Sequence, residues 1–242
     1  MCGRYTLTRF DRIVDDLEAA LGEVAQHELW RPRFNIAPTQ PAPVVVAHGG
    51  ARQVAMMRWG LVPHWAAGAR AGDKRAPLLI NARAESIEER PMFRDAARRR
   101  RCLVPADGFF EWQKRPEDPK HPQPIYLRPA SPALIAFAGL WARAKAADGS
   151  EQLSFAIITG PPNELVAPIH DRMPVVLDPA SYGAWLDPLV DGEAAQALLQ
   201  VPAVGDWRGI PVSPHVNKAT HDDPECIEPI EPGAPAKQLS LF

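Results

Sequence analysis

The residue with the greatest chemical potential is Cys2, the second residue of the chain. A residue as small as cysteine permits removal of Met1, which would leave a free α-amine beside the Cys2 thiol. The amine has an ordinary pKa of about 8 and the thiol of about 8.5, so both offer nucleophilic forms near neutral pH. Such a pair condenses with an aldehyde, first to an imine and then to a five-membered thiazolidine. Cys2 therefore offers an aldehyde-trapping group, although a cysteine at position 2 is also compatible with no function at all.

Three internal segments supply further groups that such a reaction needs. Asn81 in "LLINARAES" follows an apolar run and is expected at a strand end. Glu111 lies among aromatic residues in "ADGFFEW", where loss of solvent raises a carboxyl pKa toward that of a general acid. His170 precedes a predicted buried strand in "APIHDRMPVVL". Each residue also has a structural interpretation: Asn81 caps a turn, Glu111 lies on the wet face of a strand, and His170 bonds to a backbone carbonyl.

The elements that must position these residues are mostly short strands. Strands are predicted in "PVVVA", "ARQVAMMRWGLVP", "CLVPADGFFEWQK", "PIYLRP", "ALIAFAGLWARAKA", "LSFAIITG" and "DRMPVVL". Apolar spacing predicts an amphipathic helix over 9–26 and short helices in "PASYGAWLDP" and "GEAAQALLQ". Residues 66–77 are expected to form a surface loop, and the chain from Pro224 onward an extended, partly disordered tail.

This pattern predicts an α+β fold with an antiparallel barrel-like β core and peripheral helices. The chain of 242 residues, 46% apolar and 23% charged, suits one large domain or two small ones, and no clean domain boundary divides it. No apolar run approaches the roughly 18 residues of a membrane span, and no secretory signal is recognisable.

Cysteine usage and charge narrow the function classes. The three cysteines, at positions 2, 102 and 226, contain no CxxC pair, so we expect neither a disulfide framework nor a cysteine zinc site. A reducing cytoplasm is the expected compartment. The net charge of −2 conceals an uneven distribution, because basic residues outnumber acidic ones over 1–128 and acidic residues dominate 129–242. Of the 27 basic residues 21 are arginine, the side chain suited to phosphate contacts.

Six segments occur in an order that resembles the SRAP family of abasic-site processing proteins. They are "MCGRY", "NIAP" at 35–38, "WGLVPHW" at 59–65, "NARAES", "ADGFFEW" and "IHDRMPV". The resemblance runs from residue 2 to about residue 231 and implies one domain over 2–231, with 232–242 as a short flexible tail. It implies covalent capture of abasic sites in single-stranded DNA by a monomer, without a cofactor or a metal ion.

The resemblance assigns a role to each candidate residue. Cys2 matches the family's nucleophile, and Asn81 matches the residue that orients the amine and the sugar. Glu111 matches the proton shuttle, and His170 matches the residue that assists ring opening and imine chemistry. The residues that the resemblance places against DNA are Arg4, Asn35, Pro38, Trp65, Arg83 and Arg172. Some members carry two adjacent tryptophans where this chain has Trp65 followed by alanine, so base stacking here departs from the family's pattern.

Other interpretations remain open. "MCG" also begins the N-terminal-nucleophile amidotransferases, in which Cys2 would attack a glutamine amide, but that reaction leaves "IHDRMPV" and "ADGFFEW" unexplained. A non-catalytic single-strand binder would need only the arginines and tryptophans. Self-cleavage as a peptidase or an ordinary aminopeptidase would equally uncover Cys2. The run Arg98–Arg101 is interpreted as a solvated helix end that steers DNA, and Asn217 as a structural residue.

Overall fold

The computed structural model describes residues 2–22, 27–28, 30–63, 78–145, 149–200 and 206–230. Five strands form a closed barrel at the centre: β4 (Pro41–His48), β5 (Ala51–Trp59), β7 (Arg101–Ala106), β10 (Ile135–Lys145) and β11 (Glu151–Gly160). Antiparallel neighbours follow the order β11-β10-β7-β4-β5, and β5 then pairs in parallel with β11. Five strands cannot alternate in direction around a closed ring, so one parallel contact is required. The predicted barrel-like core is confirmed, with this parallel closure added.

Aromatic side chains pack together in the core of the barrel. Trp59, Phe137 and Phe155 are fully buried, and Tyr5 packs edge-on against Trp59 with 5.2 Å between ring centroids. Burial of each large apolar side chain stabilises the fold by roughly 1.5–3 kcal/mol. The Trp59 indole N–H also donates to the carbonyl of Ile80 at 2.9 Å. This bond fixes the backbone immediately before Asn81.

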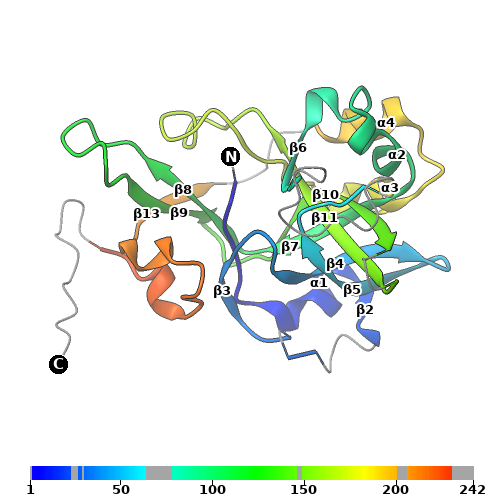
Figure 1. Cartoon of the computed structure of the whole chain (residues 1–242), viewed down its shortest axis with the longest axis horizontal. Coiled ribbons are helices and arrows are strands. Elements are labelled where there is room, and N and C mark those ends of the chain that lie inside the picture. Colours follow the sequence, from blue (N-terminus) through cyan, green and yellow to red (C-terminus); the bar gives the residue numbers. More distant parts are fainter. Residues whose placement is uncertain are drawn as a thin grey trace.

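A second sheet of five strands packs beside the barrel and carries the N-terminus (Figure 1). Its order is β13 (Trp207–Pro211), β9 (Gln123–Pro129), β8 (Gly108–Gln113), β1 (Tyr5–Leu7) and β3 (Arg33–Ile36). Antiparallel pairing of β1 with β8 places Tyr5 opposite Phe109. Continued by two residues, this register brings Gly3 opposite Glu111. Strands β8 and β9 form an antiparallel hairpin, and both lie within segments predicted as strands.

Short strands extend the barrel sheet, and short helices lie around the barrel. The remaining strands are β2 (Ala19–Ala20), β6 (Asn81–Arg83) and β12 (Met173–Pro174). The α-helices are α1 (Ile13–Leu17), α2 (Pro91–Arg99), α3 (Tyr182–Leu186) and α4 (Gly192–Leu198). Single 3-10 turns lie at Phe10–Arg12, Ala84–Ser86, Pro179–Ser181, Pro214–Asn217 and Pro224–Ile227. Helices α3 and α4 confirm the two predicted C-terminal helices, and Asp191 caps α4 by accepting the N–H of Ala194 at 2.8 Å.

The predicted helix over 9–26 is wrong in its length. The helical stretch ends at Leu17 because Glu18 adopts the left-handed conformation with φ of 50°, which stops helix propagation. The chain then enters β2, which pairs in parallel with β5. Residues 23–26 lie outside the described residues.

The predicted tail from Pro224 onward is also corrected. Residues Pro224–Ile227 form a 3-10 turn with Cys226 fully buried, and Pro229 bridges to Val212. The apolar contacts of Cys226 explain why this segment folds onto the protein. Cys226 belongs to a small buried cluster with Phe110, Tyr126, Val212 and Val216. The predicted loop at 66–77 and the tail at 232–242 lie outside the described residues. None of the described helices has the length and apolar character to cross a membrane.

Candidate active site

Cys2 and Asn81 meet where the two sheets come together. Asn81 begins β6, which pairs in parallel with β11 through Ile157, so the barrel fixes its position. Its side-chain Nδ2 donates to the backbone carbonyl of Cys2 at 2.8 Å. Its Oδ1 is buried and accepts no hydrogen bond from the residues described. Asn81 therefore holds the Cys2 backbone and retains one acceptor for another donor.

The Cys2 side chain is fully buried. Its Sγ lies 3.8 Å from the carbonyl of Arg4, a weak contact for a thiol donor. Burial raises the pKa of the Cys2 thiol well above its usual range, and the negative charge of Glu111 raises it further. The resting sulfur is therefore a thiol, and its attack needs a base that removes the proton.

Glu111 lies on β8 and is 3% exposed. Burial raises the pKa of its carboxyl group, and the positive charge of His170 partly opposes this increase. These electrostatic effects link Cys2, Glu111 and His170 in one neighbourhood. A carboxyl group with a raised pKa exchanges protons near neutral pH more readily than an exposed glutamate.

His170 lies in the connection between β11 and β12, and the two residues that follow it contact its ring. The N–H of Arg172 donates to His170 Nδ1 at 3.0 Å, and Asp171 Oδ1 lies at the same distance from that nitrogen. Both contacts are made by the same ring nitrogen, so Nδ1 is the atom through which the neighbouring residues hold the ring.

The guanidinium of Arg172 forms a clamp that the sequence did not reveal. It bonds Glu85 through both carboxylate oxygens, at 2.6 and 2.9 Å, and donates to the carbonyl of Thr159 at 2.5 Å. Hydrogen bonding to Arg172 holds the pKa of Glu85 below its usual range. Glu85 follows Asn81 by four residues in "NARAES", a position that offered a signal. The pair joins the 3-10 turn after β6 to the loop that holds His170.

Arg4 and Asn35 have their side chains engaged inside the protein. Arg4 donates to Asn35 Oδ1 at 3.0 Å and to the carbonyls of Val216 and Asn217 at 2.8 and 3.1 Å. Asn35 is fully buried, and its Nδ2 donates to backbone carbonyls of the C-terminal segment. The DNA contact of Asn35 stays a prediction, although its side chain has no exposed surface in this structure. Both residues join β1 and β3 to the segment around Val216.

The remaining predicted DNA contacts differ in their surroundings. Arg83 is exposed and has no hydrogen-bond or ion-pair partner within the described ranges, whereas Pro38 is half-buried. Pro38 precedes Thr39, whose φ of 74° makes a tight turn at the surface. Trp65 lies outside the described residues.

The basic run at Arg98–Arg101 divides into two kinds of residue. Arg98 and Arg99 are exposed near the end of α2, as expected of a solvated helix end. Arg101 is 3% exposed and donates to backbone carbonyls, those of Trp185 and Ala97 at 2.6 and 2.9 Å among them. The surface interpretation is wrong for Arg101, because its buried guanidinium donates hydrogen bonds to backbone carbonyls near the ends of neighbouring helices. Asn217, interpreted as a structural residue, accepts the indole N–H of Trp112 through its Oδ1 at 2.8 Å.

Comparisons with known proteins identify the relatives of this chain. A family model described as "SOS response associated peptidase (SRAP)" matches residues 1–219. The chain is 38% identical over 232 residues to the abasic site processing protein YoqW of Bacillus subtilis (strain 168), covering 94% of this chain and 99% of that protein. It is 29% identical to the abasic site processing protein YedK of Escherichia coli (strain K12), covering 95% and 100%.

A solved structure supports the fold. A protein from Bacteroides thetaiotaomicron superimposes with a TM-score of 0.80 at 23% identity, covering 95% of this chain and 100% of that one. Both the family model and the YoqW similarity extend over most of the chain. The chain belongs to the SRAP family.

Proposed function

We propose that this chain processes abasic sites in single-stranded DNA by forming a covalent adduct through Cys2. The surroundings of Asn81 carry the proposal. Its Nδ2 holds the Cys2 carbonyl, while its buried Oδ1 has no donor among the described residues. Such an unsatisfied acceptor is unfavourable by about 1–3 kcal/mol. The α-amine of Cys2, freed by removal of Met1, or a sugar hydroxyl would supply the missing donor.

The first step opens the abasic sugar. In the closed sugar, the aldehyde carbon carries a hydroxyl group and a bond to the ring oxygen. A base takes the hydroxyl proton, the carbon–ring oxygen bond breaks, and an acid protonates the departing ring oxygen. Glu111 and His170 are the groups that we assign to this pair of proton transfers, since the pKa of Glu111 is raised by burial.

The later steps join the sugar to Cys2. The neutral amine attacks the aldehyde carbon, and protonation of the resulting hydroxyl releases one water and leaves an iminium ion. The Cys2 S–H bond then breaks, its proton passes to Glu111, and the sulfur pair forms the bond to carbon. The product is a thiazolidine, with one water released in total. A form without the thiol would stop at the imine, from which β-elimination can cleave the strand.

DNA binding uses the exposed side chains near this centre. Arg83 offers an exposed guanidinium two residues from Asn81, and the guanidinium of Arg172 lies nearby, paired with Glu85. We place Pro38 and Trp65 against the bases next to the lesion, because single-stranded bases stack on apolar and aromatic surfaces. We expect Arg4 to hold the segment that contains Cys2 through its hydrogen bonds to Asn35 and Val216, and not to contact phosphate. The active form is proposed as a monomer that needs no cofactor.

A denaturing gel tests the proposal directly. Purified protein is mixed with a single-stranded oligonucleotide that carries one abasic site, then heated in denaturant. We expect a slow-migrating protein–DNA band with the wild type and none with Cys2→Ala. Absence of the band in the wild type, or its persistence in Cys2→Ala, would reject the proposal. Ammonia release from glutamine without DNA would instead favour an amidotransferase.

A further inference from the structure

Three side chains outside the proposed active site converge near the C-terminal end of the described chain. His215 lies in the turn Pro214–Asn217, Asp223 precedes the turn Pro224–Ile227, and Cys226 lies within that turn. One ligand atom from each, an imidazole nitrogen, a carboxylate oxygen and the thiol sulfur, all lie within 4.8 Å of one another. Cys226 is fully buried, whereas His215 and Asp223 are partly accessible. The cluster therefore has a closed sulfur side and an open side.

The spacing of nitrogen and oxygen is close to that of a tetrahedral metal site. His215 Nε2 lies 3.0 Å from Asp223 Oδ2. Nitrogen and oxygen ligands on one zinc ion, each about 2.0–2.2 Å from it, lie about 3.3 Å apart. A small outward shift of the half-exposed Asp223 would therefore admit an ion between the two groups.

The other ring nitrogen of His215 faces a carboxylate, at a separation longer than a hydrogen bond. His215 Nδ1 lies 3.9 Å from Glu225 Oε2. Metal-bound histidines commonly direct their second nitrogen toward a carboxylate, which fixes the tautomer that leaves the first nitrogen free to bind. The ring of His221 stacks on His215 with 3.8 Å between centroids, and this contact restricts rotation of the His215 ring.

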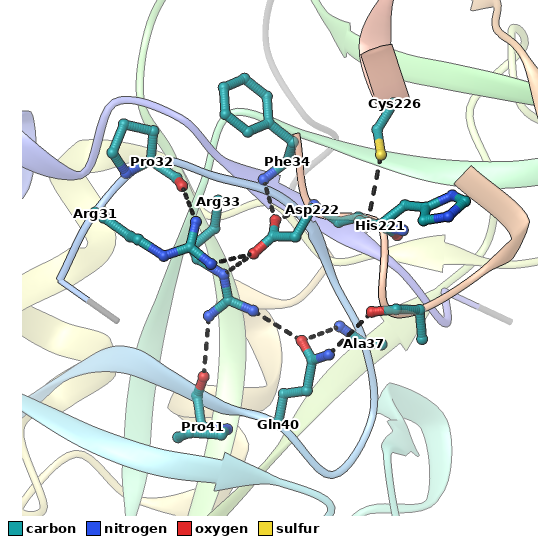
Figure 2. A network of polar contacts seen from close by, with 12 residues as sticks. Arg31, Pro32, Arg33, Phe34, Ala37, Gln40, Pro41, His221, Asp222 and Cys226 are labelled. Carbon is teal, nitrogen blue, oxygen red and sulfur yellow. Dashed lines mark hydrogen bonds and ion pairs between the residues drawn. The ribbon is translucent and has the colours of Figure 1, made fainter. Parts of the chain in front are cut away.

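The backbone that carries the cluster is firmly anchored (Figure 2). Asp222, next to Asp223, accepts the backbone N–H groups of Phe34 and Asn35 at 2.6 and 3.0 Å and pairs with Arg31 and Arg33. The Cys226 thiol lies 3.6 Å from the carbonyl of His221. The backbone next to Asp223 and the thiol of Cys226 are thus held in place.

We propose that His215, Asp223 and Cys226 bind one divalent cation of the zinc class, with a solvent molecule as fourth ligand. Sulfur with imidazole nitrogen selects zinc-class ions over magnesium or calcium, which prefer oxygen. On binding, the Cys226 S–H bond breaks, the sulfur pair binds the metal, and the proton goes to solvent. The site departs from our sequence-based expectation of no metal, because its ligands follow the spacing His-x7-Asp-x2-Cys instead of a cysteine pair.

The ion would stabilise the hydrogen-bonded segment that holds the strands next to Cys2. The segment between the ligands supplies the carbonyls of Val216 and His221, which hold Arg4 and Asn35. Joining the two turns through a metal would therefore stabilise the attachment of β1 and β3. This role does not depend on the chemistry proposed for Cys2.

Cobalt titration of the full chain tests the site, because cobalt(II) substitutes for zinc and gives an ultraviolet charge-transfer band when a thiolate binds it. We expect one equivalent of cobalt to bind, with a band that zinc abolishes. Cys226→Ser should remove the band, and His215→Gln and Asp223→Asn should each weaken binding at least about 10-fold. Circular dichroism identifies any variant that fails to fold. If the variant at buried Cys226 does not fold, Asp223→Asn still tests the site, because Asp223 is half exposed and its substitution should not disturb the core.

Two controls separate this site from other metal-binding groups. His121→Gln removes an exposed histidine whose Nδ1 lies 2.9 Å from Asp118 Oδ1. This ion pair resembles the His215–Asp223 pair but contains no cysteine. Cys2→Ser removes the N-terminal thiol. Both should retain the cobalt band. No band in the wild type, loss of the band in Cys2→Ser, or its persistence in Cys226→Ser would overturn the proposal.

Thermal unfolding gives an independent readout. Zinc at 100 times its Kd should raise the Tm of the wild type by about 5 °C. At the same zinc concentration the increase should fall to about half or less in Asp223→Asn, whose binding is at least about 10-fold weaker, and should be preserved in His121→Gln. An equal zinc-dependent increase in Asp223→Asn, or none in the wild type, would contradict a site at this cluster.

Discussion

The side-chain amide of Asn81 donates a hydrogen bond to the Cys2 carbonyl over 2.8 Å, and this bond joins the two sheets of the protein. Asn81 belongs to β6, paired with barrel strand β11, whereas Cys2 leads into β1 of the second sheet. The position of the proposed nucleophile therefore depends on the packing of both sheets. Residues far apart in the sequence, at 2, 81, 111 and 170, are assembled by strand pairing and one loop.

Substitution of Asn81 tests this relationship. Asn81→Ala should slow adduct formation at least about 10-fold, because the Cys2 backbone loses its donor and the amine loses its acceptor, and should lower the free energy of unfolding by about 1 kcal/mol. Adduct yield against time and urea unfolding measure the two effects. Asn217→Ala is the matched control, since it removes one side-chain bond to Trp112. Equal slowing in both variants would indicate a general stability effect.

Substitution of Glu111 tests proton transfer. Glu111→Gln keeps the shape of the side chain but cannot exchange a proton, so capture should slow about 100-fold or more. Binding of an intact single strand should change little, which a fluorescence titration can measure. A comparable loss of intact-strand binding would make Glu111 a structural residue.

The same variant predicts a pH dependence of stability. Burial raises the pKa of Glu111 in the folded state, so its favourable contribution is complete below the ordinary pKa of about 4.3 and is lost as pH rises through the folded value. Gln does not ionise. The free energy of unfolding of Glu111→Gln should therefore exceed that of the wild type at pH 8, and the difference should shrink toward pH 4. Urea unfolding at both pH values measures it, and a constant difference would refute the raised pKa.

Glu85 is predicted to position His170 through Arg172. Glu85→Gln weakens the two-oxygen clamp on Arg172, whose backbone N–H anchors His170 Nδ1. We expect slower capture and a shifted pH–rate profile, with a stability change below about 1 kcal/mol because Glu85 is half exposed. Glu89→Gln, nearby and exposed, is the control. An unchanged pH–rate profile in Glu85→Gln would exclude the positioning role.

Arg101 is predicted to be a structural hub. Arg101→Ala should lower the free energy of unfolding by about 3 kcal/mol or more, because several backbone carbonyls lose a buried charged donor. Arg98→Ala and Arg99→Ala, at exposed positions, should each change it by less than about 0.5 kcal/mol. Chemical denaturation of the three variants distinguishes the buried residue from its exposed neighbours.

Local patterns predicted the fold where periodicity and turn signals agreed. Strands β10 and β11 and the hairpin of β8 and β9 follow apolar runs separated by turn residues, and all are present. The helix over 9–26 failed because the left-handed Glu18 interrupts a pattern that composition alone would continue. The parallel closure of the barrel depends on β5 meeting β11, a long-range pairing that no local pattern encodes.

The candidate site was only partly predictable for the same reason. Cys2, Asn81, Glu111 and His170 stand in distinctive segments, so residue type and resemblance could single them out as candidates. The roles of Arg4 and Asn35 depend on carbonyls of the segment around Val216, more than 180 residues away from either side chain. The Glu85–Arg172 clamp likewise spans 87 residues. These contacts arise from tertiary packing and leave no mark on sequence spacing.

Thiol counting on the isolated adduct tests the central claim most directly. The wild type is reacted with abasic single-stranded DNA, treated with borohydride, denatured and alkylated, and its intact mass is measured. A thiazolidine predicts the mass of the Met1-free chain plus the oligonucleotide less one water. It also predicts no gain of hydrogen and alkylation at Cys102 and Cys226 only, out of three cysteines. Three alkylated thiols, a borohydride-reduced imine or a retained Met1 would contradict capture by the Cys2 amine and thiol together.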